Sequence, residues 1–139
     1  MQYLEAKDIP ILLKNIISSN NIPLKSKEAV RSRRIIHIIT RGRREYFWIF
    51  KGRNRDYIII PEYSCTCKDF IIHVVSEKNR RPCYHLIAQK IAEIEKKYLE
   101  VKIEEEAVID DILLEILWHN YSPTLRRILI ASAPDKGNS

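Results

Sequence analysis

The chain has 139 residues, of which 45% are hydrophobic and 30% are charged, and its formal net charge is +6 at pH 7. This length suits one ordinary domain with a hydrophobic core. No apolar run approaches the roughly 18 residues that a membrane span needs, and the first residues do not resemble a signal peptide, so we expect a cytoplasmic protein with no membrane partner.

The first half of the chain combines helical and strand patterns. Asp8 is a candidate N-cap for a helix that continues to about Ser19, and residues 26–33 suit a second short helix or an extended arm. Three β-rich runs follow, joined by short connections that contain glycine, over residues 34–40, 45–50 and 56–62. Such connections favour an antiparallel meander, so we predict a small three-stranded antiparallel sheet.

The second half is mainly helical. Apolar residues at three- and four-residue spacing predict helices over about residues 86–100 and 105–121. Asp69 can cap a short helix over residues 69–77, and residues 124–131 suit a last short helix. We therefore expect an α+β fold in a single domain, residues 1–133, whose helical C-terminal part spans residues 83–131. Residues 134–139 are expected to form a disordered tail.

All three cysteines of the chain lie in one motif with a histidine. Cys65 and Cys67 form a CxC pair, and after a spacer of 15 residues Cys83 and His85 form a CxH pair. Zinc prefers thiolate and imidazole ligands, and three Cys with one His complete its tetrahedron. We therefore predict a structural zinc site within residues 63–86 that holds the fold together and performs no chemistry. The alternatives are free buried cysteines and catalytic or redox thiols. Disulfides do not explain the motif, because three cysteines cannot all pair.

Around these ligands the sequence resembles the SWIM-type zinc finger family, whose pattern is CxC, a spacer of variable length, and CxH. The segment Cys65-Thr66-Cys67-Lys68-Asp69-Phe70 is similar to the first half of that pattern, and Cys83-Tyr84-His85-Leu86 is similar to the second half. The resemblance covers about residues 34–97. It departs from the family at Lys68, where proline is common, and at Tyr84, where lysine is common.

The chain length, the single motif in mid-chain and the helical tail further resemble the small SWIM proteins of Shu-type complexes. That resemblance implies a non-enzymatic protein that binds DNA, a protein partner or both. The most concrete partner is a RecA-like ATPase, a recombinase paralogue, in homologous recombination or DNA repair. The alternative is a stand-alone transcription regulator of viral or mobile-element origin that binds duplex DNA. The sequence contains no glycine-rich phosphate loop, paired carboxylates or Ser-His-Asp set, so we expect neither catalysis nor a small-molecule substrate.

Basic residues indicate where nucleic acid would bind. Successive turns of a meander lie at opposite ends of the sheet, so the third strand should end beside the turn at residues 41–44 and bring that turn near the zinc motif. We therefore predict a phosphate-binding surface, with single-stranded DNA preferred to duplex, formed by Arg41, Arg43, Arg44, Lys68, Arg80 and Arg81. The alternative is that these side chains only keep exposed turns soluble.

Aromatic residues are concentrated in the middle strand, at Tyr46, Phe47, Trp48 and Phe50. Aromatic rings beside a basic groove would suit stacking on unpaired bases. Strand alternation, however, makes both faces of this strand apolar, which favours burial in the core.

Charge is split along the chain. Residues 25–56 contain 11 Lys or Arg and three acids, whereas residues 93–115 contain nine acids and three Lys. This split suggests different partners on different faces. The helix expected near residues 105–121 carries an apolar stripe with a tryptophan, so we predict a protein-docking surface formed by Ile112, Ile116 and Trp118. A core helix would need the same stripe.

Overall fold

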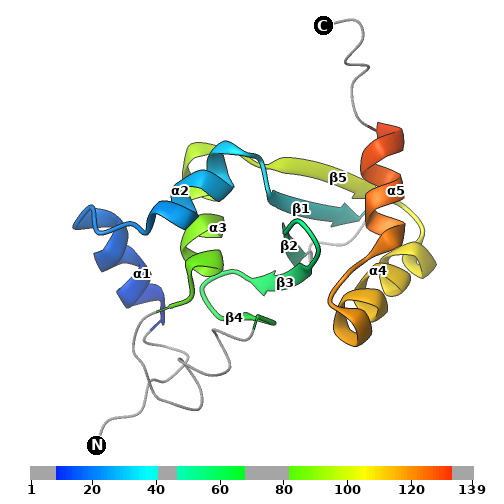
Figure 1. The fold of residues 1–139 in the computed structure, drawn as a ribbon, viewed down its shortest axis with the longest axis horizontal. Coiled ribbons are helices and arrows are strands. Elements are labelled where there is room, and N and C mark those ends of the chain that lie inside the picture. The colour runs from blue at the N-terminus through cyan, green and yellow to red at the C-terminus, as the bar shows by residue number, and fades with distance from the viewer. Residues whose placement is uncertain (1–8, 41–46, 68–81, 133–139) are drawn as a thin grey trace, which may run out of the picture.

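A computed structural model describes residues 9–40, 47–67 and 82–132, and its elements follow the apolar periodicity of the sequence (Figure 1). The helices are α1 (Ile9–Ser18), α2 (Leu24–Arg31), α3 (Tyr84–Glu95), α4 (Glu106–His119) and α5 (Pro123–Ser132). The strands are β1 (Ile35–Thr40), β2 (Phe47–Lys51), β3 (Asp56–Ile60), β4 (Ser64–Cys65) and β5 (Leu99–Ile103). The predicted α+β class is confirmed. Among these helices none has the length and apolar character that crossing a bilayer requires.

The strands form one mixed sheet in the order β4-β3-β2-β1-β5. The antiparallel meander of β1, β2 and β3 is present as predicted, with Ile49 paired to Ile36 on one side and to Ile58 on the other. The predicted size of the sheet is wrong, because β4 extends it antiparallel to β3 and β5 extends it parallel to β1. The described sheet therefore has five strands and is not purely antiparallel.

The missed strand β5 lies where the sequence predicted the end of a helix. Helix α3 stops at Glu95 because Lys96 adopts a left-handed conformation with φ 57°, and the N–H of Lys97 donates to the carbonyl of Ala92 at 2.9 Å. A left-handed residue commonly ends a helix, but it is usually glycine, so lysine gave no stop signal. The predicted helix at 69–77 and the predicted tail at 134–139 lie outside the described residues.

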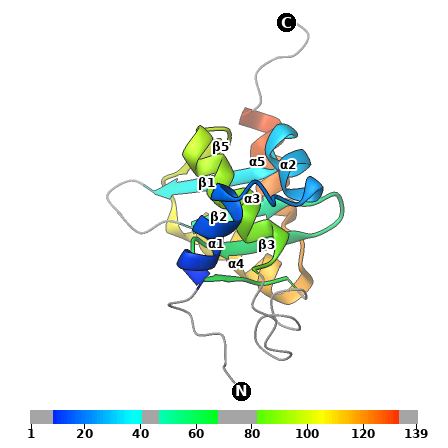
Figure 2. The same ribbon diagram turned by 90° about the vertical axis from the view of Figure 1, so that its left-hand side faces the viewer.

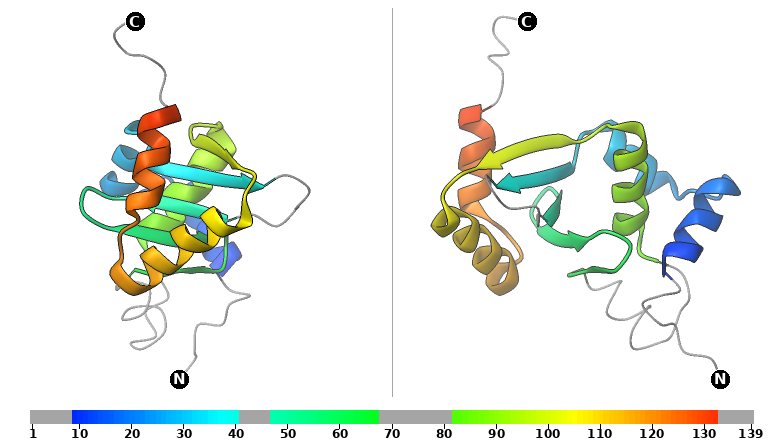
Figure 3. Two further views of the ribbon diagram at one scale, coloured as in Figure 1. Left: turned by 90° about the vertical axis from the view of Figure 1, so that its right-hand side faces the viewer. Right: turned by 180° about the vertical axis from the view of Figure 1, so that it is seen from behind.

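Helices cover both faces of the sheet. Figure 1 shows α1, α2 and α3 on one side of it and α4 and α5 on the other; Figure 2 faces the first group and the left panel of Figure 3 faces the second. Side chains of successive strand residues alternate between two cores, as the pleat requires. The core under α1–α3 includes Ile35, Trp48, Phe50 and Ile59, and the core under α4 and α5 includes Ile36, Ile38, Ile49 and Ile58.

The aromatic residues of β2 belong mainly to these cores. Trp48 is buried, stacks on His37 with ring centroids 4.0 Å apart, and meets the edge of Tyr98 at 4.8 Å. Phe47 packs against the opposite core. The structure therefore bears out burial of Trp48 and not its exposure to bases, whereas Tyr46 lies outside the described residues.

A buried ion pair joins the sheet to the C-terminal helices. The carboxylate of Asp56, at the start of β3, accepts hydrogen bonds from Arg126 at 2.7 Å and from the N–H of Ser122 at 2.9 Å. The backbone N–H of Asp56 donates to the carbonyl of Asn120 at 2.7 Å. The guanidinium of Arg126 also lies 4.3 Å from the ring centroid of Tyr121. These contacts fix the α4–α5 connection to the first residue of β3.

Replacing Asp56 with alanine should lower the free energy of unfolding by about 3–5 kcal/mol, because removing one partner of a buried pair leaves the other charge uncompensated. The control is the pair of Lys97 and Glu95, which are 3.5 Å apart and about half exposed. Glu95→Ala should cost no more than about 1 kcal/mol. Urea denaturation measures both variants, and equal losses would show that the Asp56 pair contributes no more than a surface pair.

Candidate metal centre and the adjacent pocket

The first two candidate ligands lie on a segment that folds back along β3. The chain reverses near Glu62, which has φ 62°, and returns as β4. Thr66 donates its N–H to the carbonyl of Ile58 at 3.1 Å, and its Oγ1 accepts the N–H of Ile58 at 3.0 Å. These two bonds hold the residue between Cys65 and Cys67 against the sheet and so fix the backbone that carries both sulfurs.

The other two candidate ligands come from the start of α3. Cys83 has an extended backbone, with φ −66° and ψ 157°, and its carbonyl accepts the N–H groups of Leu86 at 3.1 Å and Ile87 at 3.3 Å. Cys83 is therefore the N-cap residue of α3, and His85 lies in its first turn. The N-terminal end of a helix carries partial positive charge, which by itself favours a thiolate. The hydrogen bond with Cys65 also lowers the pKa of Cys83, but the hydrogen bond with Cys67 and burial outweigh both effects and raise it to about 12.

The four side chains converge on one point. The sulfur atoms of Cys65, Cys67 and Cys83 and a ring nitrogen of His85 all lie within 4.8 Å of one another, and all four residues are buried. Zinc bonds of about 2.3 Å to sulfur and 2.0–2.1 Å to nitrogen separate the ligand atoms of a tetrahedron by about 3.5–3.8 Å. Small side-chain movements would bring the four atoms to that spacing, so the predicted ligand set forms a possible metal site.

The surroundings of these donors also favour a cation. His85 is 3% exposed, and its ring nitrogens make no well-aligned hydrogen bond among the described residues, although the imidazole interacts with the sulfur of Cys67. A buried polar group without such a bond is destabilising, and coordination of a metal would satisfy one nitrogen. A hydrogen bond between Cys65 and Cys67 raises the pKa of Cys65 and lowers the pKa of Cys67. Among the three cysteines, Cys67 therefore forms a thiolate most readily. A bound cation would also favour deprotonation of the other two thiols.

Three aromatic rings enclose His85. Its ring centroid lies 4.0 Å from that of Tyr84, 4.3 Å from that of Phe50 and 4.7 Å from that of Tyr57. The ring of Phe50 meets the imidazole edge-on, at 75°. Residues that fix the orientation of a ligating histidine contribute to metal affinity, so these rings would support the centre.

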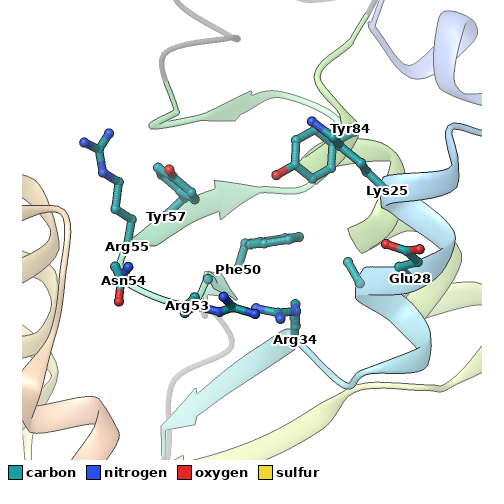
Figure 4. A pocket seen from close by; sticks show the side chains of 11 residues that line it. Lys25, Glu28, Arg34, Phe50, Arg53, Asn54, Arg55, Tyr57 and Tyr84 are labelled. Atoms are coloured by element: carbon teal, nitrogen blue, oxygen red, sulfur yellow. The ribbon is translucent and has the colours of Figure 1, made fainter.

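The same three rings line an open pocket of about 430 Å³ (Figure 4). Further lining residues come from α2, from the residue before β1 and from the turn between β2 and β3. The charged residues among them are Lys25, Glu28, Arg34, Arg53 and Arg55. Four cationic side chains and one carboxylate therefore surround a recess with aromatic walls.

The residues predicted to bind phosphate, namely Arg41, Arg43, Arg44, Lys68, Arg80 and Arg81, lie outside the described residues, and this surface stays a prediction. In the described part of the chain, the metal centre lies beside the turn at residues 52–55, because Phe50 and Tyr57 flank that turn and contact His85. The sequence reasoning missed this pocket because it did not anticipate that β4 folds back along β3. Pro61, directly after β3, was a turn signal that could have indicated the reversal.

The residues predicted to dock a protein partner lie on different faces of α4. Ile112 and Ile116 are buried in the core under α4 and α5, so they cannot contact a partner of the folded protein, and this part of the prediction is corrected. Trp118 is 78% exposed, and Leu114 and Leu117 are exposed on the same helix. Apolar residues surround much of α4, which is why the sequence pattern did not separate its core face from its exposed face.

Truncation of the two tryptophans should have very different effects on the free energy of unfolding. Trp118→Ala should change the free energy of unfolding by no more than about 0.5 kcal/mol, because an exposed side chain loses few contacts. Trp48→Ala should cost about 3–5 kcal/mol, because it leaves a cavity in the core. Thermal or urea unfolding of the two variants checks this, and a large loss from Trp118→Ala would contradict the exposed position of that side chain.

The chain matches no protein-family model, no curated protein and no solved structure.

Removing one ligand should release the metal and destabilise the fold. His85→Gln and Cys67→Ser should lose the metal measured by elemental analysis, and their melting midpoints should fall by about 3–4 °C for each kcal/mol of stability lost. The matched control is His119→Gln, because His119 is an exposed histidine at the end of α4. Full metal content and an unchanged midpoint in His85→Gln would exclude His85 as a ligand.

Proposed function

We propose that this chain is a non-enzymatic zinc-binding protein of SWIM type that binds DNA, preferring single strands to duplex. Zinc is the proposed metal because three cysteines and one histidine match its preferred donors and its tetrahedral geometry. The donor set supports a structural role, since four protein ligands leave no coordination position for water or substrate. The metal would supply a cross-link between β4 and α3, and the chain's own residues would make the contacts with DNA.

The observation that carries the DNA proposal is the basic, aromatic-walled pocket beside the metal centre. Lys25, Arg34, Arg53 and Arg55 provide positive charge there, with Glu28 as the one acidic lining residue. Basic side chains bind nucleic acid by displacing the counterions of its phosphates, and aromatic walls suit bases that are not paired. A duplex hides its base faces in the stack, so a recess of this kind favours single strands.

A protein partner completes the proposal. The exposed side chains of Leu114, Leu117 and Trp118 lie on α4, across the sheet from the pocket, so DNA and protein would bind on opposite faces. Aromatic anchors commonly dominate protein interfaces. The resemblance to small SWIM proteins of Shu-type complexes supports a RecA-like ATPase as this partner, in homologous recombination or DNA repair.

DNA binding should be strongly salt-dependent. Three phosphate contacts would give a slope of about −2 for log affinity against log salt with single strands. Fluorescence anisotropy with a labelled single-stranded oligonucleotide and with its duplex, over a range of salt concentrations, measures affinity and slope. The proposal fails if neither DNA binds at low salt, and tighter, sequence-selective duplex binding would favour the stand-alone regulator instead.

A further inference from the structure

The pocket beside His85 combines aromatic walls, which suit a flat base, with arginines, which suit a phosphate. A single strand of nucleic acid presents a base and a phosphate together. We infer that this pocket holds one unpaired nucleotide, with the base against Tyr57 and Tyr84 and the adjacent phosphate between Arg34 and Arg53. This inference rests on the proposed function and deepens it, because it assigns DNA contact to residues other than those that the sequence predicted.

The rings of Phe50, Tyr57 and Tyr84 form a concave aromatic surface, called the cup below. Phe50 forms its buried floor, and its ring lies 5.8 Å from that of Tyr84 at 90° and 6.4 Å from that of Tyr57 at 48°. Tyr57 and Tyr84 are only partly buried, so they keep accessible ring surface. A volume of about 430 Å³ falls within the range of about 300–1,000 Å³ that is usual for ligand sites. The cup is therefore large enough for a base and open enough for a strand to enter and leave.

The positive charge lies at the edge of this cup. Figure 4 shows the guanidinium groups of Arg34 and Arg53 on one side of Phe50 and the rings of Tyr57 and Tyr84 on the other. Both arginines line the pocket. Arginine suits phosphate because its planar group can donate two parallel hydrogen bonds. This side of the cup therefore suits the phosphate.

The turn that carries Arg53 is fixed in shape. Gly52 donates its N–H to the carbonyl of Arg55 at 2.7 Å, and a Cβ atom at Gly52 would lie only 2.4 Å from that carbonyl oxygen, so glycine is required. From α5, Arg126 also donates to the carbonyl of Gly52 at 2.9 Å. A turn held in this way fixes the backbone position of Arg53, so only the side chain has to be ordered on binding.

The opposite wall is held through α2. The buried hydroxyl of Ser26 donates to the carbonyl of Tyr84 at 2.9 Å and ties α2 to the start of α3. The ammonium of Lys25 lies 5.5 Å from the ring centroid of Tyr84. Lysine is flexible, so an incoming base can replace it over the ring while its charge moves to a phosphate. An acidic peptide would also be attracted to the arginines, but it would not use the aromatic cup.

The test compares Arg53→Gln with Arg127→Gln in zinc-loaded protein. Both arginines are exposed and the two changes remove the same charge, but Arg127 lies on α5, on the opposite face of the sheet. Zinc content and melting midpoint serve as folding controls. Binding of labelled oligo(dT) should weaken about tenfold in Arg53→Gln, with a salt slope that is smaller in magnitude by up to about 0.7, the value of one phosphate contact. Arg127→Gln should stay within about twofold of the parent.

Further ligands separate the contribution of base stacking to affinity from the contribution of charge. An abasic strand of the same length should bind the parent about tenfold or more weaker than oligo(dT), because base stacking is lost. Tyr84→Leu, if it keeps its zinc, should weaken oligo(dT) and not the abasic strand. Comparing oligo(U) with oligo(dT) distinguishes RNA from DNA. If Arg53→Gln weakens the binding of either strand, that strand uses the pocket. The strand that binds the parent more tightly identifies the preferred nucleic acid.

Three results would overturn the inference. If oligo(dT) binds the parent and Arg53→Gln retains the parent affinity and slope, DNA binds elsewhere and only the pocket assignment fails. If the abasic strand or a poly-glutamate peptide binds as tightly as oligo(dT), the pocket recognises charge and not a nucleotide. If no oligonucleotide binds the parent at low salt, the proposed function fails with it.

Discussion

Three thiols and an imidazole, buried together within 4.8 Å, form the constraint on which the rest of this structure depends. Strand β4 has only two residues, and its pairing with β3 at two positions is extended by the two hydrogen bonds between Thr66 and Ile58. A metal bonded to Cys65 and Cys67 on one side and to Cys83 and His85 on the other would join this short strand to the first turn of α3. Such a metal would therefore anchor the segment that follows β3 to the start of α3.

The centre also shapes the surface that we propose for DNA. His85 is one of its candidate ligands, and the same imidazole packs against Phe50, Tyr57 and Tyr84, which line the pocket. Across the sheet, the buried pair of Asp56 and Arg126 holds the turn that carries the basic rim. The pocket is thus fixed from two directions, by the cluster of candidate ligands on one face of the sheet and by α5 on the other.

Sequence reasoning succeeded where a local pattern had one structural meaning. The short, glycine-containing connections between the β-rich runs correctly indicated the meander, and the spacing of Cys65, Cys67, Cys83 and His85 correctly indicated that these four residues lie together. It failed where tertiary pairing decides the outcome. Residues 99–103 become a strand because β1 has a free edge for them, and no local signal reports that edge. The apolar stripe of α4 likewise could not assign Ile116 to the core and Trp118 to the surface, because both positions are apolar.

The most direct test of this account is X-ray absorption at the zinc edge of the purified protein, because it reports the number and type of metal ligands. A closed centre predicts three sulfur atoms at about 2.3 Å and one nitrogen at about 2.0–2.1 Å. An oxygen atom in the fourth position would show an open site and would contradict the structural role. Fewer than three sulfur ligands, or no zinc edge at all, would contradict the centre itself.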